Sequence, residues 1–173
     1  MSEKKYDIEI LRPEVREENI KFKGEGFSQE RLAKIKKGLL TLHTLEIMAT
    51  NIYRFQITKE KSELNKFLIA AMLNEMTHIQ DFEIKLYEYG WKPTPLRYAY
   101  LTLGFIFGTF SRLRGAKAIL QMGIWVESQA VKHYSELLSD IEWDDDTRLV
   151  VEKDQADEDG HIARWKALLA AQK

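Results

Sequence analysis

The sequence contains no cysteine among its 173 residues. Disulfides, Cys-ligated zinc, iron–sulfur clusters and a rubredoxin-type iron centre are therefore excluded. If the protein carries out redox chemistry, the electrons must come from an external donor. The start of the chain, Met1 to Asp7, is charged where a signal peptide would be apolar, so we expect a cytoplasmic protein.

Neither an excess of one charge nor a long apolar run is present. The 26 Lys and Arg residues are balanced by 27 Asp and Glu, so there is no basic field to attract nucleic acid. The longest uncharged stretch, Tyr98 to Phe110, is shorter than the ~20 residues that cross a bilayer. It could still lie at an interface, which would make the protein peripheral to the inner membrane face.

Proline is scarce, and the length suits a single domain. Residues 1–27 are charged and weakly patterned, and we assign them to an N-terminal extension. Residues 28–173 form the predicted domain. No flexible linker or low-complexity segment divides them.

Helical periodicity predicts four long helices. The first runs from the N-cap Ser28 to about residue 57, and the second starts at Thr58 or Ser62 and ends near residue 89, before Gly90. The third covers about 115–139, and the fourth runs from Asp144 to about residue 170. The apolar segment between Pro95 and Gly115 predicts a short bridging helix. The expected fold is all-α: a ferritin-like four-helix bundle of two hairpins with a long crossover.

Each long helix carries one glutamate in the middle of an apolar stripe, and two of these glutamates begin a Glu-x-x-His turn. Residues three apart on a helix share a face, so each turn directs a carboxylate and an imidazole to one place. Each turn follows a lone stripe glutamate by about thirty residues. The candidate ligands are Glu46, Glu75, His78, Glu127, Glu158 and His161.

One Glu-x-x-His turn is a weak signal, since a charged helix produces it by chance. Six such residues in mid-stripe, in helix order, indicate a common site. Four buried carboxylates are very costly unless cations neutralise them. Di-iron carboxylate bundles have the same ligand pattern: two helices contribute one Glu each, and the other two contribute a Glu-x-x-His turn each. Two iron ions are therefore expected, although the same donors suit manganese.

Several residues near these stripes are candidates for supporting roles. Asn74, Asp154 and Asp157 could hydrogen-bond an imidazole, or could be solvated polar residues. Tyr53, two turns after Glu46, could bond a carboxylate or take part in a redox step as a catalytic residue; core packing is the alternative. At Gly160 we expect close packing beside the metals.

The apolar segment and the first stripe contain the candidates for a substrate channel. Gly104 and Gly108 permit close helix contact, either inside the chain or in a homo-oligomer. Aromatic side chains around them could form an entrance for a lipid-soluble substrate or a membrane-facing patch. The candidate channel residues are Leu45, Met48, Tyr98, Phe105 and Tyr134.

From about Leu42 to Leu169 the sequence resembles the demethoxyubiquinone hydroxylases of ubiquinone biosynthesis, within the ferritin-like superfamily. The resemblance rests on Glu46 with Ile52-Tyr53 and Gln56, Glu75-x-x-His78 with Phe82, Lys92-Pro93-Thr94, Gly104, Gly108, Gly115-x-Lys117-Ala118, Val126-Glu127 and His133-Tyr134. It implies that the six candidate ligands bind iron and that the site activates oxygen to hydroxylate a quinone ring.

The sequence departs from that family beside the first ligand. Leu45 and Met48 stand where the family has glycines, so the space near the metals is reduced or reshaped. The leading hypothesis is a di-iron oxidase or monooxygenase acting on a quinone-like ring. The alternatives are a ferritin-like protein whose substrate is iron or peroxide, and a metal-stabilised scaffold that binds a partner without turnover.

Overall fold

A computed structural model of the chain describes residues 16–172, in which all regular elements are helices and no strand occurs. The division at residue 27 remains a prediction, and most of the predicted extension lies outside the described residues. The helices are η3 (Glu17–Asn19), α1 (Gln29–Gln56), α2 (Glu63–Glu88), α3 (Arg97–Leu113), α4 (Ala116–Asp140) and α5 (Asp145–Ala171). The predicted all-α fold class is confirmed.

The helix ends follow from local chemistry. Ser28, Ser62 and Asp144 each accept a hydrogen bond from a backbone N–H of the first turn, and thereby cap α1, α2 and α5. After α2 the chain turns at Gly90, whose φ of 72° is one that side-chain-bearing residues rarely adopt. Of the two predicted starts of the second helix, the cap at Ser62 is the correct one, and the helix does not begin at Thr58.

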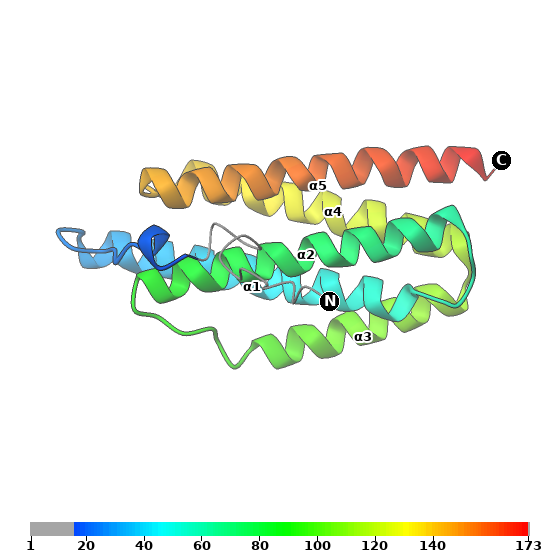
Figure 1. Cartoon of the computed structure of the whole chain (residues 1–173), viewed down its shortest axis with the longest axis horizontal. Coiled ribbons are helices and arrows are strands. Elements are labelled where there is room, and N and C mark those ends of the chain that lie inside the picture. The colour runs from blue at the N-terminus through cyan, green and yellow to red at the C-terminus, as the bar shows by residue number, and fades with distance from the viewer. Residues whose placement is uncertain (1–15, 173) are drawn as a thin grey trace, which may run out of the picture.

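The four long helices form two hairpins (Figure 1). The hairpin of α1 and α2 and the hairpin of α4 and α5 are each closely packed, and α1 also contacts α4 while α2 contacts α5. A loop at residues 57–62 joins the first pair, and residues 141–144 join the second. The interior between the hairpins receives one stripe from every long helix.

Helix α3 lies along the outside of α1 and leads into α4 (Figure 1). Its contact with α1 depends on two glycines. A Cβ on Gly104 would lie 2.6 Å from the Met48 carbonyl oxygen, and one on Gly108 would lie 2.5 Å from that of Ile52. The backbones can approach only because no side chain intervenes, so the glycine pair makes an internal helix contact.

The other sides of α3 remain exposed. Only Gly104, Gly108 and Ser111 of this helix are buried, whereas Tyr98 and Phe110 are more than half exposed. Within residues 16–172 no helix combines the length and the low polarity needed to span a bilayer.

A partly buried ionic network attaches the segment before α1 to the end of α2 and the start of α5. The Lys23 ammonium lies 2.6 Å from carboxylate oxygens of both Asp144 and Asp146 and 3.5 Å from Glu88. Lys85 joins the network through Glu88 and Asp146. These contacts link the end of α2 to the start of α5.

Candidate metal centre

The six predicted ligands lie together in the interior. Glu46 projects from α1, Glu75 and His78 from α2, Glu127 from α4, and Glu158 and His161 from α5. The four carboxylates are at most 1% exposed. The periodicity that placed them in apolar stripes also places them at one level of the interior.

The two histidines connect the carboxylates of different helices. His78 Nδ1 lies 3.1 Å from Glu158 Oε1 and 3.5 Å from Glu75 Oε2. His161 Nδ1 lies 3.1 Å from Glu75 Oε1, 3.3 Å from Glu127 Oε1 and 3.4 Å from Glu158 Oε2. Glu75 and Glu158 therefore each have one oxygen directed toward each histidine.

These contacts define two overlapping groups of donor atoms. In each group, four side chains contribute one donor atom each, and these atoms lie within 4.8 Å of one another. The first group consists of Glu46, Glu75, His78 and Glu158. The second consists of Glu75, Glu127, Glu158 and His161. Glu75 and Glu158 belong to both. If two cations were bound, each group would offer one of them an imidazole and a carboxylate of its own, in addition to the shared carboxylates of Glu75 and Glu158.

Unsatisfied polar atoms provide the test of whether cations fit. Both oxygens of Glu75 and of Glu158, Glu127 Oε2, and Nδ1 of both histidines are buried without a hydrogen-bond partner. Buried polar atoms are normally paired, and buried carboxylates are costly unless neutralised. The unpartnered atoms are those that face the shared space, so the donor set fits two divalent cations.

The proton equilibria of the cluster lead to the same conclusion. Burial and the carboxylates of Glu158 and Glu75 raise the pKa of Glu46 and of Glu127 well above its ordinary value. Burial lowers the pKa of His161, but Glu127, Glu158 and Glu75 outweigh burial and raise it to about 12. Without cations the cluster therefore retains protons, which metal binding would release.

Two tyrosines cross between the hairpins to reach the terminal glutamates. Tyr53 lies seven residues after Glu46 on α1, but its hydroxyl donates to Glu127 of α4. Tyr134 lies seven residues after Glu127, and its hydroxyl donates to Glu46 Oε1 at 2.6 Å. Tyr53 thus bonds a carboxylate, as one of the sequence interpretations had it; its catalytic role remains a prediction.

The predicted supporting residues gather around His78. Asp157 Oδ2 lies 3.2 Å from His78 Nε2 and accepts a hydrogen bond from Asn74 Nδ2 at 3.3 Å. Asp154 Oδ1 lies 3.8 Å from the same imidazole nitrogen. Asn74 thus bonds Asp157 instead of an imidazole, because it faces α5 one turn away from His78.

A cavity of about 230 Å³ lies between α1 and α4 and reaches Glu46. Of the predicted channel residues, Leu45 and Met48 line this cavity. Tyr134 does not line it, but its hydroxyl donates a hydrogen bond to Glu46, which does. Tyr98 and Phe105 lie elsewhere: Tyr98 is 61% exposed, and Phe105 packs edge-on against Phe55. Gly104 and Gly108 occupy the α1-facing side of α3, which turns these aromatic rings away from the cavity.

The structure adds cavity residues that sequence reasoning did not select. Trp125, Gln129 and His133 line the cavity opposite Met48. They stand four residues apart on α4, on the flank of the stripe that contains Glu127. Because residues four apart share a helix face, this spacing could have indicated a common surface. Polar residues beside an apolar stripe, however, usually face solvent.

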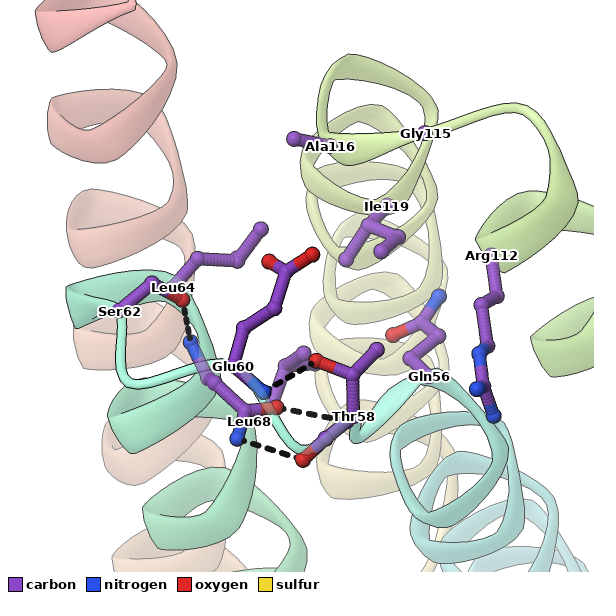
Figure 2. Close-up of a pocket in the computed structure, with 11 residues that line it drawn as sticks. Gln56, Thr58, Glu60, Ser62, Leu64, Leu68, Arg112, Gly115, Ala116 and Ile119 are labelled. Carbon is purple, nitrogen blue, oxygen red and sulfur yellow. Dashed lines mark hydrogen bonds between the residues drawn. The ribbon is translucent and has the colours of Figure 1, made fainter.

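A second cavity, of about 110 Å³, lies beside the α1–α2 loop, where α3 leads into α4, and contains none of the predicted site residues. Figure 2 shows its wall, where Thr58 in the α1–α2 loop hydrogen-bonds the start of α2. Gln56 and Arg112 form the opposite wall. This cavity is separate from the candidate metal centre.

Comparison with known proteins agrees with the site. A family model described as ubiquinone biosynthesis protein COQ7 matches residues 33–172. The crystal structure of a hypothetical protein from Methanococcus jannaschii DSM 2661 has a similar fold, with a TM-score of 0.70 and 16% identity; the match covers 87% of this chain and 85% of that chain. A search of curated proteins found no match.

Proposed function

Because this chain belongs to the family of the ubiquinone biosynthesis protein COQ7, the demethoxyubiquinone hydroxylases, we propose that it is a di-iron monooxygenase that hydroxylates a quinone-like ring. The observation that carries the proposal is the pair of donor groups that share Glu75 and Glu158. We further propose that α1, α2, α4 and α5 form a ferritin-like four-helix bundle, with α3 on the crossover. Residues 28–173 would be its domain, and residues 1–27 an extension.

Glu46, Glu75, His78, Glu127, Glu158 and His161 would hold two iron ions, or manganese ions in their place. When bound, iron supplies the reduction of oxygen that the reaction needs. For each ring C–H converted to C–OH, one O₂, two electrons and two protons are consumed, and the second oxygen atom leaves as water. The electrons come from an external donor, since the chain has no cysteine to hold a redox cluster of its own.

The surrounding residues would position the substrate and hold protons. The cavity beside Glu46 is mostly apolar and smaller than the roughly 300–1,000 Å³ of a typical drug-sized site. It suits a single ring, with any long apolar tail outside. Burial and the Glu127 carboxylate raise the pKa of Tyr53 well above its ordinary value, so its hydroxyl keeps a proton beside a ligand.

The exposed apolar side of α3 would serve the remaining partners. It offers a surface for peripheral contact with a membrane, where a lipid-soluble quinone resides, or for a second copy of the chain.

The test is an anaerobic reconstitution with Fe²⁺, followed by metal analysis and turnover. We expect two irons per chain and, with a short-chain quinone analogue, a reductant and ¹⁸O₂, a product that carries one ¹⁸O atom. The Glu75→Gln variant should lose both irons and product, whereas Glu63→Gln, at an exposed site on the same helix, should lose neither.

Two outcomes would contradict the proposal. If the protein binds only traces of metal, the donor set is not a metal centre. If it binds two irons and consumes oxygen or peroxide with Fe²⁺ alone but never yields a hydroxylated ring, the alternative of an iron-oxidising or peroxide-consuming protein replaces it.

A further inference from the structure

The two halves of the donor set differ in charge. On α5, Asp154 and Asp157 stand four and one residues before Glu158; at the same offsets before Glu75, α2 has Ala71 and Asn74. Three residues after the histidines, α2 has Asp81 where α5 has Arg164. Beyond the glutamates of the donor set, acidic residues therefore accompany His78, while the equivalent positions around His161 lack them. The other half of the protein thus shows that the packing does not require these acids.

Asp154 is the least expected of these acids. It is fully buried, and neither carboxylate oxygen has a hydrogen-bond partner. The nearest cationic groups are Lys153 Nζ at 3.5 Å and His78 Nε2 at 3.8 Å from Oδ1. A carboxylate in this position is costly unless a cation compensates it. The equivalent residue Ala71 is just as buried without any such cost.

The acids form a path from solvent to the imidazole. The side chain of Asp157 is 41% exposed, while its Oδ2 lies 3.2 Å from His78 Nε2. Asp81, 10% exposed, pairs with Lys153 Nζ at 2.9 Å, and Lys153 itself is 61% exposed. Donor atoms of His78, Asp154 and Asp157 lie within 4.8 Å of one another, as a common cation would require.

We propose that Asp154, Asp157 and Nε2 of His78 form a third cation site, which receives divalent transition-metal ions at the α2–α5 face and passes them to the interior donors. Two carboxylates and one imidazole suit ions such as Mn²⁺, Fe²⁺ or Co²⁺. Lys153 covers the site and must move aside for a cation to enter. The inference rests on the proposed metal centre as the destination of the ion.

The two nitrogens of His78 determine when this site can be filled. A neutral imidazole has one proton, so Nε2 can bind a cation only while the proton is on Nδ1, which faces Glu158 and Glu75. Once Nδ1 binds a metal in the interior, the proton must be on Nε2, which then donates to Asp157. The receiving site and the interior position that uses His78 are therefore not filled together, and an ion held by Nε2 must leave it before Nδ1 binds one.

The main experiment follows Co²⁺ uptake by the metal-free full-length chain in a stopped-flow spectrometer. Acidic clefts raise association rates of cations by roughly 10- to 1,000-fold. We expect Asp154→Ala and Asp157→Asn to load at least tenfold more slowly than wild type, with an unchanged final content of two ions. These variants install the residues of the other half, Ala71 and Asn74, so they should fold.

Asp159→Asn removes the same charge from an exposed position of α5 and should load like wild type. If Asp154→Ala also loads at the wild-type rate, the inference is wrong. If wild type never holds two ions, the proposed metal centre itself is wrong. A role limited to orienting His78 would instead lower the final metal content and leave the uptake rate unchanged.

Equilibrium binding provides a second test that does not depend on kinetics. The double variant Glu75→Gln/Glu158→Gln removes the two shared interior ligands. We expect it to bind one Co²⁺ per chain at the receiving site and to lose that ion when Asp154→Ala is added. Binding that persists without Asp154, or no binding in a double variant whose circular dichroism shows it to be folded, would overturn the inference.

Discussion

Each of the two tyrosines near the donor set supports a glutamate of the opposite hairpin. Tyr53 and Tyr134 belong to α1 and α4, and both are fully buried. Their rings pack against equivalent aromatic residues, Tyr53 on Trp165 at 5.4 Å and Tyr134 on Phe82 at 6.2 Å between centroids. The crossing bonds tie the orientation of each terminal glutamate to the packing of the other half.

Replacing Tyr134 by phenylalanine should therefore destabilise the metal-free protein. Glu46 Oε1 would lose its donor while it stays buried, which costs about 1–3 kcal/mol. Urea denaturation should show this loss in the free energy of unfolding. Tyr98→Phe, at an exposed position, should change it by less than ~0.5 kcal/mol. Equal values for the two variants would show that the Tyr134 bond contributes nothing.

Two glycines inside long helices should respond in opposite ways to alanine. A Cβ on Gly123 would lie 2.7 Å from the ring of Trp165, whereas one on Gly160 meets nothing within 4 Å. Gly123→Ala should destabilise by about 1–3 kcal/mol through overpacking, and Gly160→Ala should stabilise by about 0.5–1 kcal/mol through helix propensity. Thermal and urea unfolding would measure both; a change of the same sign in both variants would contradict this explanation.

The Gly160 result also corrects an expectation from sequence. We expected close packing beside the metals, yet the position faces open space. Of the two glycines, packing requires Gly123, because the ring of Trp165 occupies the space that a side chain at this position would need. Sequence could not identify it, since the need for a glycine arises from a partner on another helix.

At the scale of elements, the ends of the long helices agree with prediction because local residues determine them. Ser28, Asp144 and Gly90 act within one turn of the chain. The stripes also brought the six candidate ligands together, although their role as ligands remains a prediction. The orientation of α3 was harder to predict, because its buried side consists of the small residues Gly104, Gly108 and Ser111, while large apolar residues lie on its exposed sides. Only the Gly104 and Gly108 pair indicated which side meets α1.

The network at the hairpin ends predicts a pH-dependent contribution to stability. Partial burial raises the pKa of Asp144, but Lys23, Thr147 and Tyr89 outweigh burial and lower it to about 2. Because the folded-state pKa lies below the ordinary value of ~3.9, the stabilisation is complete above about pH 4 and is lost as the pH falls through about 2.

Asp144→Asn should test this effect, since asparagine retains the N-cap and removes the charge. At pH 7 we expect the free energy of unfolding to fall by about 1 kcal/mol, a modest value because solvent screens this partly exposed group. The difference from wild type should shrink as the pH falls from 4 to 2. Asp145→Asn, at the exposed neighbour, should show little difference at any pH; a constant deficit for Asp144→Asn would refute the charge explanation.

At the scale of the whole molecule, the proposed metal centre predicts that the stability of the fold depends on metal. A ligand that binds only the folded chain at 100 times its dissociation constant adds about 2.7 kcal/mol per site. For a chain of this size, each kcal/mol raises the melting temperature by roughly 2–4 °C. With two sites filled, adding Mn²⁺, or Fe²⁺ without oxygen, should therefore raise the melting temperature by roughly 10–20 °C, and a chelator should reverse the change.

Glu75 belongs to both donor groups, so Glu75→Gln should lose most of this increase, whereas Glu63→Gln should keep it. Metal binding should also release protons, because the metal-free cluster retains them, and the increase should therefore weaken as the pH falls. Calorimetry in buffers of different ionisation enthalpy would count the protons. A melting temperature that does not respond to metal, or that responds equally in Glu75→Gln, would show that the buried carboxylates are balanced by protons alone.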